Sequence, residues 1–165
     1  MEHIVSPNGR IPVNLLYADN LLGHAKYSWY NPPQKRVMYF ASKLNIPDGA
    51  YHVPGLLYVA HNNNLDLYAF KGSKPVKKLY KAPFFNTSNG SVCLGNSSLT
   101  YPSSPSYKDL MASWDKTFCL PPFSPLGGNG TPTKTNLSIA TRHWQDEFAS
   151  IELIPLTKSL QHIVG

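Results

Sequence analysis

Four short apolar segments near the start of the chain constrain its fold more than any other feature. They cover residues 26–30, 36–41, 56–60 and 65–70. Asn31-Pro32-Pro33-Gln34-Lys35 separates the first two and has the composition of a turn. His61-Asn62-Asn63-Asn64 separates the last two, and asparagine tolerates positive φ. The pattern predicts a four-stranded antiparallel meander.

A helix is predicted after the strands, over residues 107–118. Ser106 is placed to cap it, and apolar side chains recur at helical spacing at Leu110, Met111, Trp114 and Phe118. This aromatic stripe is expected to pack in the core rather than to stack on bases. A short helix is also predicted over 141–150, with Trp144 and Phe148 one turn apart. The order of strands and helices indicates an α+β fold.

The chain is expected to be a single domain, because 165 residues can bury a substantial core. Its core is expected over about residues 26–123. Residues 124–136, rich in Pro, Gly and Thr, are expected to be a flexible loop, followed by a C-terminal helix and tail over 137–165. Residues 13–22 fit a strand or a helix, and the sequence leaves both open.

Composition argues against a secreted or membrane protein. No apolar run approaches the roughly 20 residues of a membrane span, and the first residues lack the order of a signal peptide. The cysteines, Cys93 and Cys119, and the scattered histidines show no metal-ligand spacing, so neither a metal nor another cofactor is predicted. A reduced, cytoplasmic protein is the expectation.

Cys93 is the strongest candidate for chemistry. It follows a short polar turn, and no histidine lies nearer to it in sequence than His61. A cysteine hydrolase needs a histidine to take the thiol proton. A thiol among neutral amides suits a milder task, which is to accept an already activated acyl group as a thioester and release it to an amine. The alternative is a buried, structural cysteine.

The segment around Cys93 resembles the active-site segment of ubiquitin-conjugating enzymes. Asn89-Gly90-Ser91-Val92-Cys93-Leu94 matches the Asn-Gly turn and nucleophile of that family. Asn86 corresponds to the asparagine of its His-Pro-Asn tripeptide, one residue nearer the cysteine, while Phe84 and Phe85 replace the histidine and proline. A closer resemblance is to the bacterial PRTRC system protein B family, the prokaryotic ubiquitin-conjugating family D. Tyr80, residues 54–60, 82–86 and 92–95, Trp114 and Phe118 carry this match.

The resemblance implies a fold, an activity and partners. The fold would be that of ubiquitin-conjugating (UBC) enzymes, with the meander followed by the cysteine-bearing loop and packing helices. Cys93 would be the nucleophile. Asn86, with Asn96 as a second candidate, would stabilise the oxyanion formed when lysine attacks the thioester. The partners would be a ubiquitin-like modifier, a ThiF-like adenylating activating enzyme and a JAB-type peptidase, with antiphage defence as one setting. In relatives an acidic residue near the thiol assists the incoming lysine, and here Asp109 and Asp115 are candidates that the sequence does not separate.

Two other classes of function compete with this interpretation. One is a non-catalytic adaptor that binds the modifier on the same fold. The other is a single-strand nucleic-acid binder, suggested by the net charge of +6 and the many aromatic residues. The basic residues gather at Lys71, Lys74, Lys77, Lys78 and Lys81, between a strand and the cysteine segment. They fit a solvated linker, or a docking surface for an acidic protein or a phosphate backbone. Nucleic acid is not the expected partner.

Overall fold

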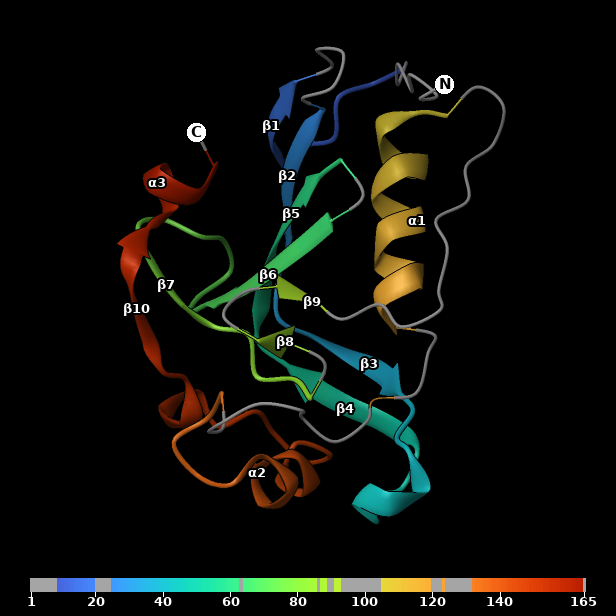
Figure 1. Ribbon diagram of the computed structural model, residues 1–165, viewed down its shortest axis with the longest axis vertical. Helices are drawn as coiled ribbons and strands as arrows, with labels where there is room; N and C mark the ends of the chain where they lie inside the picture. The colour runs from blue at the N-terminus through green and yellow to red at the C-terminus, as the bar shows by residue number, and fades with distance from the viewer. Residues whose placement is uncertain are drawn as a thin grey trace.

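A twisted, antiparallel sheet forms the centre of the molecule (Figure 1). The computed structural model describes residues 9–19, 25–62, 64–85, 87–88, 91–92, 105–119, 123 and 132–164. The main sheet has the order β1-β2-β5-β6-β7-β10, and β9 pairs with both β6 and β8. Its strands are β1 (Leu15–Asp19), β2 (Lys26–Asn31), β5 (Gly55–His61), β6 (Asn64–Phe70), β7 (Lys78–Lys81), β8 (Thr87–Ser88), β9 (Ser91–Val92) and β10 (Pro155–Ser159). A second sheet pairs β3 (Gln34–Met38) with β4 (Gly49–Val53). The architecture is therefore mixed α and β with mostly antiparallel pairing.

The predicted turn at residues 31–35 is wrong, and with it the four-stranded meander. β2 pairs with β5 from Lys26↔His61 to Asn31↔Leu56, and β3 pairs with β4 in the same register from Gln34↔Val53 onward. The β2–β5 and β3–β4 ladders thus belong to one long hairpin, and its hydrogen bonding is interrupted between the two ladders. In that register Pro33 lies opposite Pro54. Because proline has no backbone N–H, the hydrogen-bonded ladder breaks there without reversing the chain.

The actual reversal lies between β3 and β4. It contains the 3₁₀ helix η1 (Ser42–Leu44), and Asn45 after it has a φ of 53°.

The second predicted hairpin is confirmed. β5 and β6 pair from Gly55↔Phe70 to His61↔Asn64, and Asn62 in the turn has a φ of 55°. Asparagine is well suited to that left-handed conformation because its short polar side chain can bond locally.

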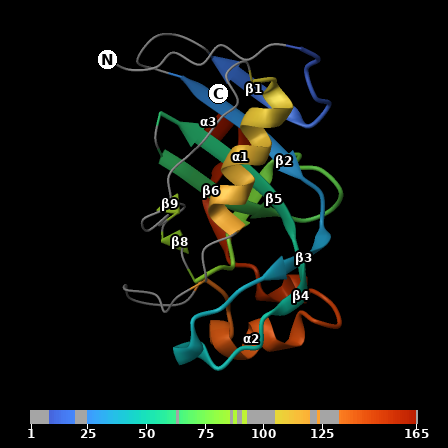
Figure 2. The same cartoon turned by 90° about the vertical axis from the view of Figure 1, so that its right-hand side faces the viewer.

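The predicted helix after the strands is confirmed as α1 (Tyr107–Cys119). The Ser106 hydroxyl accepts from the Asp109 backbone N–H at 3.1 Å, and the Asp109 carboxylate accepts from the Ser106 N–H at 3.0 Å. This is a capping box with aspartate at its third helical position. The predicted stripe, Leu110, Met111, Trp114 and Phe118, is buried. Figure 2 shows α1 lying across one face of the main sheet.

The C-terminal part contains two short helices and an edge strand. The predicted helix over 141–150 is displaced, because α2 (Leu137–His143) begins and ends earlier. The side chain of Asn136 caps α2 by accepting from the Ser138 N–H. Trp144 and Phe148 do meet, with ring centroids 4.9 Å apart. Beyond the 3₁₀ helix η2 (Ser150–Glu152), the tail forms β10 and α3 (Leu160–Val164).

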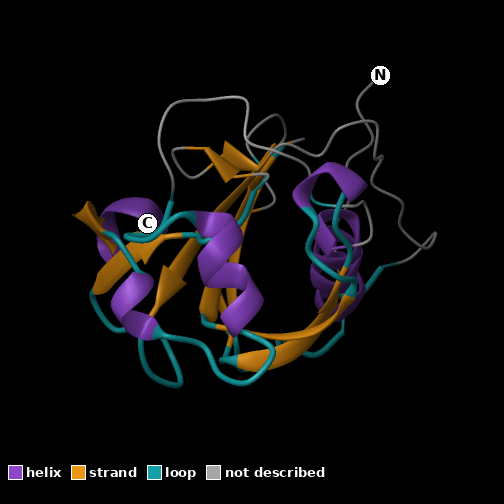
Figure 3. Ribbon diagram, turned by 90° about the horizontal axis from the view of Figure 1, so that it is seen from below, coloured by secondary structure: helices purple, strands orange, loops and turns teal. Residues whose placement is uncertain are grey.

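Helices lie on both sides of the main sheet (Figure 3). Each face of the sheet buries its own apolar cluster. The larger cluster lies on the α1 side and extends to α2 through Leu137, Ala140 and Trp144. The smaller one lies on the other face and consists of Leu57, Val59, Phe70, Leu79 and Ile163 of α3.

Residues 15–19, left open by the sequence, form strand β1 rather than a helix. Residues 20–22 and 124–131 lie outside the described residues. None of the helices in the described ranges is long and apolar enough to cross a membrane.

Candidate functional site

The segment that leads to Cys93 begins with two buried phenylalanines. Phe84 is 2% exposed, and its ring centroid lies 5.3 Å from that of Phe118 and 6.0 Å from that of Phe123. Phe85 is also buried and packs edge-on against Phe40. The sequence resemblance aligns Phe84 and Phe85 with the histidine and proline of a tripeptide. Here they anchor the segment in the core by burying large apolar surfaces.

A buried hydroxyl fixes the backbone after these rings. The Thr87 side chain is buried, and its Oγ1 lies 3.0 Å from the Ala82 carbonyl oxygen and 2.9 Å from that of Phe84. The hydroxyl therefore donates toward these two backbone carbonyls. A hydrogen bond of this kind inside the protein holds one backbone conformation, since an unpaired buried hydroxyl would be costly.

A small hairpin then carries the chain to Cys93. β8 and β9 pair through Thr87↔Val92 and Ser88↔Ser91, and Ser91 of β9 also pairs with Asp66 of β6. Val92 is buried in the larger apolar cluster. The hairpin is thus attached to the main sheet on one side and to the core below. The sheet fixes the chain up to the residue directly before the candidate nucleophile.

The predicted site residues themselves, Cys93, Asn86 and Asn96, lie outside the described residues, as do Asn89 and Gly90. Their predicted roles remain predictions. Cys119, the other thiol, is the last residue of α1.

The two candidate acids on α1 both have structural partners. Asp109 closes the capping box with Ser106. Asp115 forms an ion pair with Arg36 of β3 and accepts from the Tyr58 hydroxyl at 2.6 Å. Arg36 Nη1 also donates to the Tyr58 hydroxyl at 2.8 Å. Tyr58 is fully buried and stacks on Trp29, with ring centroids 5.1 Å apart. This network joins α1 to both sheets, and the sequence alone did not indicate it.

Asp66 is a half-buried acid that sequence reasoning missed. It stands opposite Ser91, next to the cysteine-bearing hairpin. Burial raises the pKa of its carboxyl above the ordinary value, and the positive charges of His61, Lys158 and Lys26 offset part of that rise. A signal was present, because Asp66 interrupts the apolar strand Leu65-Asp66-Leu67. The alternation of a strand then places Leu65 and Leu67 toward α1 and Asp66 toward the other face.

The basic cluster from the sequence lies in the β6–β7 connection and in β7. Lys71, Lys74, Lys77 and Lys78 are exposed. Lys71 and Lys78 place their ammonium groups 4.9 Å and 5.7 Å from the Tyr80 ring centroid. Such contacts are modest at an exposed site. Within the described ranges no three His, Cys, Asp or Glu side chains gather as they would around a metal ion.

The chain was compared with protein families, curated proteins and solved structures. A family model described as prokaryotic E2 family D, E2 denoting ubiquitin-conjugating enzymes, matches residues 2–136. The match includes the cysteine segment and α1 and ends before α2. Comparisons with curated proteins and with solved structures found no significant match.

Proposed function

Because the chain belongs to prokaryotic E2 family D, we propose that it is a ubiquitin-conjugating-like enzyme with Cys93 as its nucleophile. It receives a ubiquitin-like modifier as a thioester from an activating enzyme and passes it to a lysine or another amine. The family membership carries the general, E2-like role. The thioester on Cys93 and the amine acceptor are the specific content of the proposal.

The chemistry consists of two acyl transfers. In the first, the Cys93 thiolate attacks the carbonyl carbon of the modifier's terminal residue, which is held as a thioester on the activating enzyme. The new C–S bond forms as the old one breaks, and the activating enzyme's thiolate leaves. In the second, a neutral amine attacks the Cys93 thioester. The amine loses a proton, an amide forms, and the Cys93 thiolate leaves. No oxidant or reductant is needed.

The observation that best supports this proposal is how the sheet holds the chain before Cys93. Phe84, Phe85, Thr87 and Val92 are all buried, and β9 is paired to β6. A reacting group is most effective when rigid elements fix the backbone that carries it. The segment therefore supplies a firm base for a nucleophile that has to meet two large partners in turn.

Asn86 and Asn96 are proposed as donors to the oxyanion. Asn86 stands between Phe85 and Thr87, whose side chains are both buried. An asparagine N–H directed at the developing negative charge lowers the barrier, because its dipole is already oriented before reaction. Asn89 and Gly90 are assigned to the turn between β8 and β9, where an Asn-Gly pair is favoured.

The proposed partners follow from the resemblance to PRTRC system protein B. They are a ThiF-like adenylating activating enzyme, a ubiquitin-like modifier and, in the same pathway, a JAB-type peptidase. The proposed setting is the bacterial cytoplasm, within an antiphage system. An adaptor without catalysis would use the same fold but would carry no covalent modifier.

A charging assay tests the proposal. The protein is mixed with its activating enzyme, the modifier and ATP, and adducts are separated with and without thiol reductant. We expect an adduct that the reductant removes and that mass spectrometry places on Cys93. Cys93→Ala should abolish it, Cys93→Ser should give a slower, reductant-resistant ester, and Cys119→Ala should leave it unchanged. An undiminished adduct in Cys93→Ala would refute the assignment, and non-covalent binding without any adduct would favour the adaptor.

A further inference from the structure

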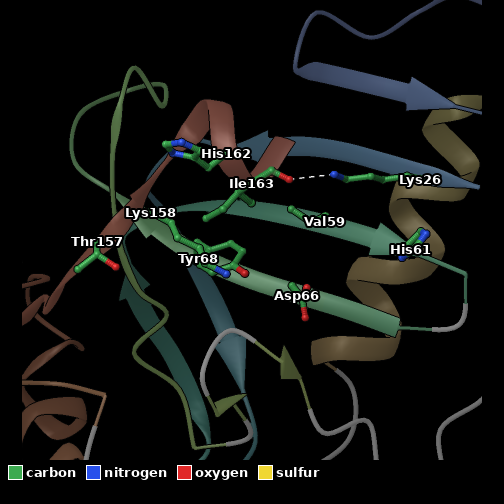
Figure 4. A pocket seen from close by; sticks show the side chains of 9 residues that line it. All are labelled: Lys26, Val59, His61, Asp66, Tyr68, Thr157, Lys158, His162 and Ile163. Atoms are coloured by element: carbon green, nitrogen blue, oxygen red, sulfur yellow. Dashed lines mark hydrogen bonds between the residues drawn. The ribbon is translucent and has the colours of Figure 1, made fainter. Parts of the chain in front are cut away.

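A cavity of about 480 Å³, open to solvent and with a mixed polar and apolar lining, lies on the face of the main sheet opposite α1 (Figure 4). Strands β2, β5 and β6 form its floor, and β10 and α3 form one wall. Val59 and Ile163 supply apolar surface at its base. Its size falls in the range of pockets that hold small molecules, which is roughly 300–1,000 Å³.

The wall of this cavity belongs to the part of the chain beyond the family match. The match ends at residue 136, whereas Thr157, Lys158, His162 and Ile163 come from β10 and α3. Lys26 on β2 is joined to this added segment, because its Nζ donates to the Ile163 carbonyl at 2.9 Å. The C-terminal segment thus turns one open face of the sheet into a lined cavity. Phosphate binding in this cavity would be an activity distinct from the proposed thioester chemistry.

The lining carries more positive than negative charge. Figure 4 shows Lys26 on one side and Lys158 with His162 on the other. His61 lies on the lining as well, and Asp66 is the one carboxylate among the described residues that line the cavity. An ammonium group has three N–H donors. Lys26 can therefore hold Ile163 and a ligand oxygen together, and Lys158 can donate to an anion from the other side of the cavity.

Two further groups favour an anion that carries hydroxyl groups. Burial raises the pKa of Tyr68 to about 12, so its phenol stays protonated and can donate a hydrogen bond. Asp66 can accept one from a ligand hydroxyl. The lining therefore offers the ammonium groups of Lys26 and Lys158 as charged donors, the Tyr68 hydroxyl as a neutral donor and the Asp66 carboxylate as an acceptor.

We propose that this cavity binds a small phosphate monoester, of the size of a sugar phosphate or a mononucleotide. Its phosphate pairs with the ammonium group of Lys158 on the side of the cavity where His162 lies, and Lys26 adds positive charge from the other side. The sugar hydroxyls face Asp66. Lysine suits a phosphate because it acts as a point charge with freely oriented donors.

The test is a binding titration of the full chain with ribose 5-phosphate and with AMP, followed by NMR of the Val59 and Ile163 methyl groups. Both ligands should shift these methyls saturably. Lys158→Met should weaken binding about tenfold, the scale of one charge-assisted bond. Lys158 is exposed, so this variant should remain folded. Lys108→Met is the matched control, since Lys108 is exposed on α1, on the other face of the sheet, and should leave binding unchanged.

Three results would overturn the proposal. The first is no saturable shift of either methyl group with ribose 5-phosphate or AMP. The second is equal affinity for glutamate or citrate, which would make the cavity a general anion site. The third is binding that strengthens steadily with oligonucleotide length and is insensitive to Lys158→Met, which would indicate a nucleic-acid surface elsewhere. None of these results depends on charging of Cys93, so this test and the charging assay fail independently.

Discussion

Asn86 occupies the position between two anchored side chains, Phe85 and Thr87, in the proposed site. If it donates to the oxyanion, Asn86→Ala should leave charging of Cys93 largely intact. It should slow discharge onto lysine about 10²-fold, the lower end of the range for losing one such donor. Single-turnover rates of charging and of discharge, measured on the same preparation, check this.

Asn96→Ala is the matched comparison for Asn86→Ala. Discharge should be slowed less by Asn96→Ala than by Asn86→Ala. A parallel fall of charging and discharge in Asn86→Ala would instead assign Asn86 to holding the backbone of the loop. A larger effect of Asn96→Ala on discharge alone would move the donor role to Asn96.

The Tyr58 hydroxyl is the shared member of the network that ties α1 to the sheets. It donates to Asp115 and accepts from Arg36. It also accepts from Asn31 Nδ2 at 3.5 Å. Tyr58→Phe keeps the ring that stacks on Trp29 but removes these three hydrogen bonds, so it should lower the free energy of unfolding by about 1–3 kcal/mol. Urea denaturation measures the change. Tyr39→Phe, at a partly exposed ring, should change it by less than about 0.5 kcal/mol.

Among the elements, the junction between β4 and β5 is the most sensitive to added volume. Gly55 faces the ring of Phe70 across the β5–β6 pair, and a Cβ added there would overlap that ring. Gly55→Ala should therefore destabilise the protein by about 1–3 kcal/mol, as overpacking does. Gly49→Ala is the control in the neighbouring strand, because its Cβ would lie 3.9 Å from Gln145 Nε2, an ordinary contact.

Thermal unfolding of the two variants side by side checks the prediction. A Gly55→Ala protein as stable as Gly49→Ala would contradict the packing of Phe70 against this backbone. Phe70→Leu combined with Gly55→Ala should recover part of the loss, since the smaller side chain vacates the overlapping space.

Some elements could be predicted because their signals are local. The helix α1 has its cap and its apolar spacing within a few residues, and the β5–β6 turn has its asparagines in place. The Pro32-Pro33 pair led to the wrong prediction of a turn, because two prolines fit a chain reversal and a break in a strand ladder equally well. Only the partner strand, with Pro54 opposite Pro33, decides between them.

In the candidate site, too, local signals could be predicted and contacts between distant residues could not. Cys93 could be proposed from a contiguous motif. The ion pair of Arg36 with Asp115, and the neighbours of Asp66, join residues far apart in the chain. The C-terminal strand β10 is short and polar, and it pairs with β7 from a great distance in sequence, so its pattern alone gave no assignment.

For the molecule as a whole, the Asp66 carboxyl should lower the stability of the folded protein as the pH rises, whereas most carboxyl groups do the opposite. Its pKa is raised in the folded protein, so its ionised form costs stability above the folded pKa. That cost disappears as the pH falls through the folded pKa. Asp66→Asn should therefore raise Tm at neutral pH, and the gain should vanish by about pH 3, below the unfolded pKa of about 3.9.

Thermal scans of wild type and Asp66→Asn across this range measure the effect. Asp146→Asn, at an exposed position, should show little change at either end. A loss of Tm on Asp66→Asn at neutral pH would mean that attraction to Lys26, Lys158 and His61 outweighs the cost of burial.

The whole molecule combines the family domain, which includes Cys93, with a C-terminal segment that lines a cavity on the sheet face opposite α1. If the domain passes a modifier from thiol to amine, a single-turnover chase should show it. In this experiment the purified Cys93 adduct is mixed with free lysine and sampled over time. We expect the adduct to decay faster as the lysine concentration increases, with an equal yield of modifier joined to lysine. Decay to free modifier at a rate independent of lysine would contradict this expectation and show a hydrolase.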